Sequence, residues 1–173
     1  MDRIAIDMDE VIADVIPKFI KLYNRDFGVP LDLVIEPGNE VFMQIPEDVN
    51  QKWHEYINEP GFFRDLDVIK DSQEVIRALQ EKYDVYIVSA AMEFRNSLVD
   101  KYDWLAEHFP FLDWQHIMFC GNKIVEVDVL IDDRIKNFVN FKGRPLLYTS
   151  PHNLLITEYE RVNSWKDIAS LLL

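Results

Sequence analysis

Hydrophobic residues fall into two alternating patterns along most of the chain. Short, nearly continuous apolar runs occur at 4–7, 84–90, 116–120, 127–133 and 145–149. Helical spacing of apolar residues occupies 15–28, 71–83 and 96–109, with a shorter helix near 135–141, and a terminal helix over 163–173 has Ser164 as its N-cap. Alternating strands and helices predict an α/β, Rossmann-like fold, in which helices cover both faces of a parallel sheet.

The section from Leu31 to Asp67 interrupts this alternation. It is rich in proline and glycine and contains one helical pattern at 46–59. We therefore expect a small helical insertion after the first strand, with boundaries at 16–67, and a core formed by 1–15 and 68–173. The aromatic residues of this section are Phe42, Trp53, Tyr56, Phe62 and Phe63.

The charge balance restricts the class of partner. The 173 residues include 31 acidic and 18 basic ones, a formal net charge of -13, whereas binding to a nucleic acid polymer requires a basic surface. A small anionic substrate is compatible with this charge if a metal ion and a few cations surround it. Cys120 is the only cysteine, which excludes disulfides within one chain. The start "MDRIAIDMDE" has no signal-peptide pattern, and no run is long enough to span a membrane, so we expect a cytoplasmic protein without a membrane partner.

Carboxylates gather directly after the first strand. Asp7, Asp9, Glu10 and Asp14 lie within the stretch 7–14, immediately beyond an apolar run. Unpaired carboxylates that lie close together repel one another, so a fold that keeps them together usually supplies a cation. A metal site is the first hypothesis for this stretch.

Other strand ends carry complementary groups. The run 84–90 contains Ser89, the run 127–133 ends in Asp132 and Asp133, and Lys123 lies between them. In open α/β sheets ligands bind beyond the carboxyl ends of the strands, where these groups should converge. Alone, each residue has a structural explanation, such as a solvated loop, a cap or a surface lysine. Together they suit phosphoryl transfer, which needs a metal, a cation and a carboxylate nucleophile.

This set resembles the four motifs of the haloacid dehalogenase-like phosphohydrolases, and more narrowly the 5′(3′)-deoxyribonucleotidases, including bacterial members. The resemblance spans nearly the whole chain. The segments that carry it are "DMDEVIAD", "PGFFRDLDVI", "DVYIVSA", "KYDWLAEHF", "LIDDR" and "RVNSWKDI".

The resemblance implies a role for each motif residue. Asp7 resembles the nucleophile that forms an aspartyl-phosphate, and Asp9 the general acid and base. Mg²⁺ would be bound by the Asp7 carboxylate, the Asp9 backbone carbonyl and Asp133. Asp132 would be an outer-shell partner, and Ser89 and Lys123 would hold the phosphoryl oxygens.

The resemblance also makes the insertion a cap that closes over the substrate. Phe42 and Phe63 would stack on a base, whereas we expect Trp53, Tyr56 and Phe62 to form the core of the cap. Three positions depart from the family. Glu10 replaces a usual glycine, Val15 replaces an aromatic residue of the eukaryotic enzymes, and a lysine after Ser89 is missing, for which Arg95 is a substitute.

We therefore expect a Mg²⁺-dependent phosphatase that hydrolyses 5′(3′)-deoxyribonucleoside monophosphates. A phosphatase for another small phosphorylated metabolite is a second hypothesis, because the shape of the cap sets specificity. A signalling receiver domain uses similar residues, but its acidic pair comes first and its lysine last. A nucleotide-binding module without catalysis is disfavoured because both catalytic carboxylates are present. The expected partner is a small phosphomonoester, and a homodimer is left open.

Overall fold

The computed structural model describes residues 1–28, 36–40, 43 and 47–173 of the chain. Its centre is a six-stranded sheet with the order β5-β4-β1-β6-β7-β8, in which every neighbouring pair is parallel. The α/β parallel fold expected from the sequence is therefore confirmed. The strands are β1 (Arg3–Ile6), β4 (Asp84–Ser89), β5 (Ile117–Phe119), β6 (Val129–Asp132), β7 (Arg144–Tyr148) and β8 (Glu160–Val162).

The register of the central strands places their polar ends side by side. Ile6 at the end of β1 pairs with Ile87 of β4 and with Ile131 of β6. The next residues of β1 and β6, Asp7 and Asp132, therefore lie level with each other at one edge of the sheet. Central strands of this kind are apolar on both faces, and the side chains of β1 from Ile4 to Ile6 are fully buried.

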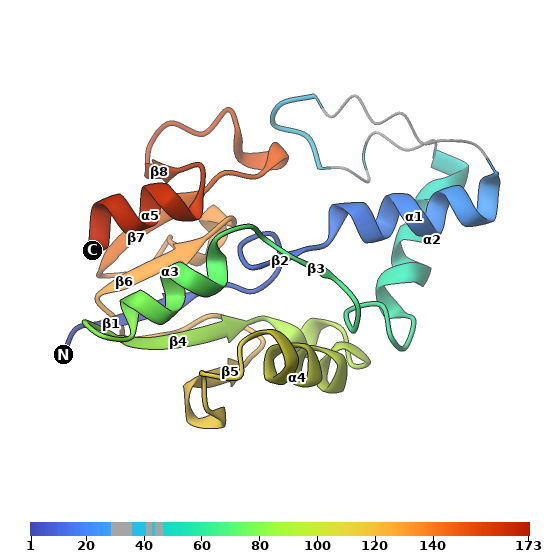
Figure 1. Cartoon of the computed structure of the whole chain (residues 1–173). Helices are drawn as coiled ribbons and strands as arrows, with labels where there is room; N and C mark the ends of the chain where they lie inside the picture. Colours follow the sequence, from blue (N-terminus) through green and yellow to red (C-terminus); the bar gives the residue numbers. More distant parts are fainter. Residues whose placement is uncertain (29–35, 41–42, 44–46) are drawn as a thin grey trace.

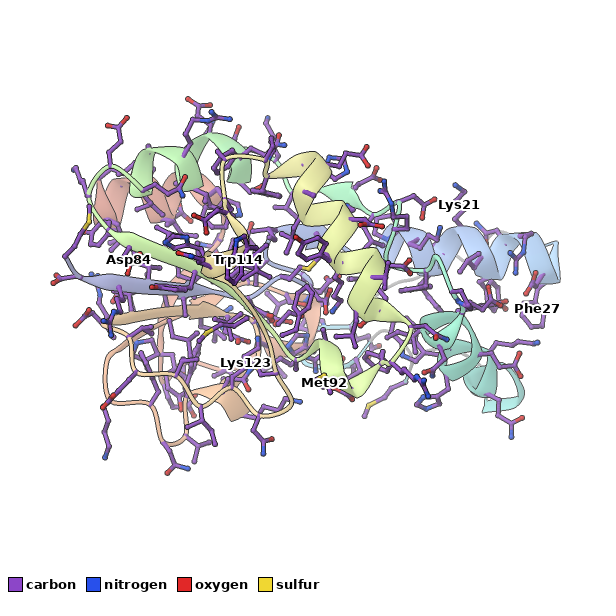
Figure 2. The ribbon with its side chains drawn as sticks, turned by 90° about the horizontal axis from the view of Figure 1, so that it is seen from below. Lys21, Phe27, Asp84, Met92, Trp114 and Lys123 are labelled. Carbon is purple, nitrogen blue, oxygen red and sulfur yellow. The ribbon has the colours of Figure 1, made fainter. Side chains whose placement is uncertain are left out.

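Three helices cover one face of the sheet. They are α3 (Ser72–Leu79), α4 (Ser97–His108) and α5 (Trp165–Leu172), whose buried side chains share one hydrophobic cluster with Ile4 and Ile6. Ala5, which points to the opposite face, packs in a second cluster with Phe138 and with partly buried Phe141 and Tyr159. Figure 2 shows α3 on one side of the sheet and irregular chain on the other. In the described part of the chain, loops and short 3₁₀ turns take the place of the helices expected on the second face.

The short 3₁₀ helices follow strand ends or loops. The helix predicted near 135–141 is one of them and is shorter than expected. Their bounds are η2 (Ala91–Glu93), η3 (Trp114–His116), η4 (Ile135–Asn137) and η5 (Pro151–Asn153).

Two further helices extend from the carboxyl edge of the sheet (Figure 1). They are α1 (Ile16–Phe27), which begins beside Pro17 and ends at Gly28 with φ +66°, and α2 (Glu47–Asn58). The rings of Phe19 and Trp53 join the two helices at a centroid distance of 4.2 Å, and Tyr56 donates a 2.6 Å hydrogen bond to Asp26. The chain leaves and re-enters the sheet region through a small antiparallel pair, β2 (Ala13–Asp14) with β3 (Asp67–Val68). Neither this pair nor β8 was predicted from the sequence.

Local sequence signals define the last helix. Ser164, the predicted N-cap, accepts a 3.3 Å hydrogen bond from the Asp167 backbone N–H. The N- and C-termini lie together at the end of the sheet opposite α1 and α2 (Figure 1). None of the helices in the described residues has the length and apolar character required to cross a bilayer.

Candidate functional site

A tight loop fixes the residues that follow β1. The Met8 carbonyl accepts hydrogen bonds from the Ile12 and Ala13 backbone N–H groups, at 2.9 and 3.0 Å. The buried Trp165 indole of α5 donates a 2.8 Å hydrogen bond to the Val11 carbonyl from the other side. These hydrogen bonds hold the loop, and with it Asp7 and Asp9, at the carboxyl edge of the sheet.

Three buried carboxylates meet at this edge. Asp7, Asp132 and Asp133 each offer a ligand atom, and these atoms lie within 4.8 Å of one another. The Lys123 ammonium lies between two of them, 2.5 Å from Asp7 Oδ1 and 2.7 Å from Asp132 Oδ2. The structure thus brings together the predicted site residues from the end of β1 (Asp7), from the loop before β6 (Lys123) and from the end of β6 (Asp132 and Asp133).

Burial determines the protonation behaviour of this cluster. Burial raises the pKa of Asp7, and the charge of Lys123 lowers it again in part. Burial also raises the pKa of Asp133, and the negative charges of Asp7 and Asp132 raise it further. Burial alone would lower the pKa of Lys123, but the charges of Asp7 and Asp132 outweigh it and raise that pKa. A divalent cation would offset the repulsion, and an all-oxygen donor set suits a hard ion. The cluster therefore fits a divalent metal.

The surroundings of the acidic pair are unequal. Asp132 is fully engaged: besides Lys123, it accepts 2.8 Å hydrogen bonds from the Arg134 backbone N–H and from Asn137 Nδ2. The Asp133 carboxylate has longer contacts, 3.6 Å to Arg134 Nε and 3.5 Å to His152 Nε2. Asp133 is thus the member of the pair with an oxygen available for a further ligand.

Lys101 of α4 is a site residue that the sequence analysis missed. Its side chain is only 1% exposed, and its ammonium lies 2.5 Å from Asp9 Oδ2 and donates a 3.1 Å hydrogen bond to Ser89 Oγ. The ammonium also lies 4.4 Å from the centroid of the Phe63 ring. The helical spacing of the sequence indicates that Lys101 is buried, because it shares one face of the helix with Ser97, Trp104 and Leu105, which are all buried.

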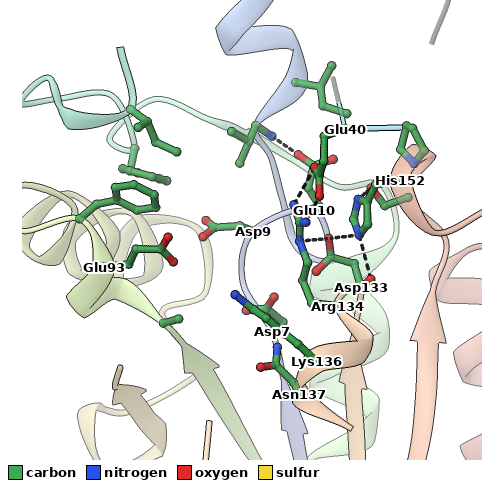
Figure 3. A pocket seen from close by; sticks show the side chains of 18 of the residues that line it. Asp7, Asp9, Glu10, Glu40, Glu93, Asp133, Arg134, Lys136, Asn137 and His152 are labelled. Atoms are coloured by element: carbon green, nitrogen blue, oxygen red, sulfur yellow. Dashed lines mark hydrogen bonds and ion pairs between the residues drawn. The ribbon is translucent and has the colours of Figure 1, made fainter. Parts of the chain in front are cut away.

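A cavity of about 390 Å³ opens above these groups. Asp7, Asp9 and Asp133 lie at its floor (Figure 3), and Lys123 also lines it. Ser89 is fully buried and does not line the cavity. Phe63 lines the cavity, and Phe42 lies outside the described residues. The larger apolar side chains of the wall are those of Val15, Ile16, Trp53, Ile57, Phe63 and Phe94.

The aromatic residues of the insertion divide between core and cavity. Tyr56 and Phe62 are buried, as expected for the core of this segment. Trp53, which was expected to belong to that core alone, packs on Phe19 and also lines the cavity.

The sequence matches, over residues 2–173, the model of the family described as 5′ nucleotidase, deoxy (pyrimidine), cytosolic type C protein. The chain belongs to this nucleotidase family. It is 35% identical over 181 residues to the 5′(3′)-deoxyribonucleotidase of Bacillus subtilis (strain 168), with 98% of each chain covered. It is 46% identical over 173 residues to a protein of Staphylococcus aureus (strain Mu50) whose name gives the same activity as provisional; the match covers 98% of this chain and 94% of that protein.

Solved structures show the same fold at low sequence identity. A haloacid dehalogenase-like family hydrolase from Streptococcus pneumoniae superimposes with a TM-score of 0.64 at 12% identity, covering 100% of this chain and 99% of the other. A hydrolase of the same superfamily from Bacillus subtilis, solved with magnesium bound, gives a TM-score of 0.62 at 15% identity, covering 99% and 98%. The predicted superfamily and the enzyme class, a hydrolase of phosphoric monoesters, are confirmed. The receiver and non-catalytic alternatives have no support from these findings.

The structure bears on two of the three departures from the nucleotidase family, Glu10 and the missing lysine after Ser89. Glu10 adopts a left-handed φ of +62°, which explains why glycine is usual at this position. Its carboxylate accepts a 2.9 Å hydrogen bond from the Val15 backbone N–H at the start of α1, and burial raises its pKa to about 7. Arg95 is exposed and does not line the cavity, so the cation beside Ser89 is Lys101 instead of the expected Arg95.

Proposed function

We propose that the chain hydrolyses deoxyribonucleoside monophosphates through a phosphorylated Asp7, with Mg²⁺ as its cofactor. The observation that carries this proposal is the contrast between two carboxylates on the cavity floor. Asp7 is buried against Lys123, whereas Asp9 is tied to Lys101 through Oδ2 and its Oδ1 has no hydrogen-bond partner among the described residues. Environments that differ in this way allow one carboxylate to attack while the other transfers a proton.

The metal would be held by the Asp7 and Asp133 carboxylates and the Asp9 backbone carbonyl. Asp132 has its oxygens engaged by Lys123, Arg134 and Asn137, which supports an outer-shell role. Mg²⁺, when bound, withdraws charge from the transferring phosphoryl group.

In the first step the Asp7 carboxylate attacks phosphorus, and the bond from phosphorus to the sugar oxygen breaks. Asp9 transfers a proton to that leaving oxygen, so that a neutral nucleoside departs. Lys123 holds the phosphoryl oxygens, and the Ser89 hydroxyl joins it only if it turns from its buried position beside Lys101 toward the cavity. In the second step water attacks the aspartyl-phosphate, Asp9 takes the proton of the water, and inorganic phosphate leaves with Asp7 restored.

Residues 16–67 are proposed as a cap over a core of 1–15 and 68–173. The cap contributes Trp53, Ile57 and Phe63 to the cavity wall, and Val15, the core residue that directly precedes the cap, lines it as well. A ribose 2′-hydroxyl against such an apolar wall would lack a partner, which costs roughly 1–3 kcal/mol and favours deoxyribose. The aromatic residues provide a stacking surface for the base.

A phosphate-release screen tests the proposal. The substrates are deoxyribonucleoside and ribonucleoside monophosphates, sugar phosphates and an aryl phosphate, each with and without Mg²⁺. We expect Mg²⁺-dependent release that is fastest with a deoxyribonucleoside monophosphate. Faster release from a sugar phosphate would instead support the second hypothesis, a phosphatase for another small metabolite.

Cellular location and assembly stay predictions. We propose a cytoplasmic location, and fractionation of producing cells tests it. A homodimer is tested by light scattering during size-exclusion chromatography of the purified chain, where a mass near 20.5 kDa would identify a monomer.

A further inference from the structure

Glu93 is one of three carboxylates of the cavity wall that the mechanism does not use, with Glu10 and Glu40. It ends η2, the short turn that follows β4, and lines the cavity beside Ala90 and Phe94. Its side chain is exposed and has no ion pair or hydrogen bond with any other described residue. The other lining carboxylates do have partners: Asp7 with Lys123, Asp9 with Lys101, Glu10 with the Val15 N–H, Glu40 with Arg134, and Asp133 with Arg134 and His152.

The orientation of Glu93 relates it to one part of the substrate. Figure 3 shows its carboxylate turned toward Asp9, across the cavity from Asp133. The proposed function places the transferring phosphoryl group at Asp7 and the leaving oxygen at Asp9. The group attached to that oxygen, a deoxyribose, must then pass alongside Glu93.

A deoxyribonucleoside monophosphate keeps one free sugar hydroxyl, at C3′ when the phosphate is at C5′ and at C5′ when it is at C3′. We propose, on the basis of the proposed function, that Glu93 is a specificity-determining residue that accepts a hydrogen bond from this hydroxyl and repels a phosphate group in its place. The hydroxyl supplies the donor that the carboxylate lacks in the free protein.

Charge gives this selection its direction. A second phosphate would carry nearly two negative charges at neutral pH. Lys123, Lys101 and Arg134 are already paired with carboxylates, and no cation of the described residues forms an ion pair with Glu93; Lys136 is the further lysine that lines the cavity. Repulsion between solvent-exposed charges several ångströms apart changes affinity by about tenfold and weakens as salt increases.

The test compares kcat/KM for three substrates. They are deoxyuridine 5′-monophosphate, its 2′,3′-dideoxy analogue, which lacks the hydroxyl, and deoxyuridine 3′,5′-bisphosphate; phenyl phosphate, which has no sugar, is the reference. Glu93→Gln keeps a hydrogen-bond acceptor but removes the charge, and Glu93→Ala removes both. Glu81→Gln is the matched control, because Glu81 is exposed and precedes β4 at the opposite end of the same strand.

For the native protein we expect kcat/KM for the monophosphate to be about tenfold higher than for either analogue. In Glu93→Gln, kcat/KM for the bisphosphate should come within about threefold of that for the monophosphate, and kcat/KM for the dideoxy analogue should stay low. In Glu93→Ala, kcat/KM for both analogues should approach that for the monophosphate. High salt should reduce the difference in kcat/KM between the monophosphate and the bisphosphate in the native protein but not in Glu93→Gln. Glu81→Gln should behave as the native protein, and phenyl phosphate hydrolysis should change little in any variant.

Two results would overturn the inference. The first is equal kcat/KM of the native protein for all three nucleotides. The second is a ratio of kcat/KM for the monophosphate to kcat/KM for the bisphosphate that is the same in Glu93→Gln as in the native protein. A different pattern, phenyl phosphate hydrolysis without any hydrolysis of deoxyuridine monophosphate, would refute the proposed substrate class and this inference with it.

Discussion

Replacing Lys101 by methionine tests how Asp9 is prepared for proton transfer. Methionine keeps the length and apolar character of the lysine stem but cannot hold Asp9 Oδ2 or the Ser89 hydroxyl, which lie 2.5 and 3.1 Å from the ammonium. Without this contact the Asp9 carboxylate can rotate away from the leaving oxygen. We expect kcat to fall on the order of 10²–10³-fold, the usual loss when a preorganised charged donor is removed.

The free energy of unfolding of the Lys101→Met protein should change by less than the loss of a fully buried ion pair would suggest. Breaking a fully buried ion pair costs about 3–5 kcal/mol because one charge is left without a partner. Here the remaining partner, Asp9, has a side chain that is 32% exposed and accessible to water, and removing the buried ammonium also removes its desolvation cost. We therefore expect the free energy of unfolding to change by less than about 2 kcal/mol.

The assay measures kcat and KM with a deoxyribonucleoside monophosphate and with an aryl phosphate, whose better leaving group needs less protonation. Lys101→Met should slow the first step, the attack of Asp7 and departure of the leaving group, less for the aryl phosphate than for the nucleotide. Lys142→Met, at an exposed lysine without a described partner, is the matched control. If Lys101→Met keeps kcat within about threefold of the native value in a folded protein, the positioning of Asp9 by Lys101 is refuted.

Three other changes have defined outcomes. Asp7→Asn should abolish phosphate release without lowering the melting temperature of the metal-free protein, because it relieves repulsion in the acidic cluster; substantial turnover by the pure variant would contradict the nucleophile assignment. Phe63→Leu keeps the packing of a residue that is 1% exposed but removes the ring, so KM should rise about three- to tenfold for a deoxynucleotide and not for phenyl phosphate; an equal rise for both would indicate a purely structural role. The pKa of His116 is raised by its hydrogen bond to Asp113 and by Asp84, so its contribution to stability is complete below the unfolded value near 6.5 and is lost as pH rises through the folded value. Denaturation of His116→Ala should therefore show a larger loss at pH 5.5 than at pH 9, and an equal loss at both would show that the two aspartates do not act through the charge of His116.

The sequence predicts the carboxyl edge of the sheet well because two local signals act together there. Apolar runs identify β1, β4 and β6, and the polar residue that ends each run must lie at the same edge if the strands are parallel. The meeting of Asp7, Asp132 and Asp133 follows from this geometry. The Gly28 and Ser164 signals likewise mark helix ends, because capping depends on residues next to each other in the chain.

The sequence by itself therefore determined the fold class, the edge that carries the site and most of its acidic residues. Only the tertiary structure decided that Lys101 of α4 contacts Asp9, that Arg134 pairs with Glu40, and that loops cover the second face of the sheet. The physical reason is that periodicity encodes which side of an element is buried, whereas the partner of a buried charge depends on how distant elements pack. Lys101 and Asp9 are 92 residues apart, and only the docking of α4 against the loop after β1 makes them an ion pair.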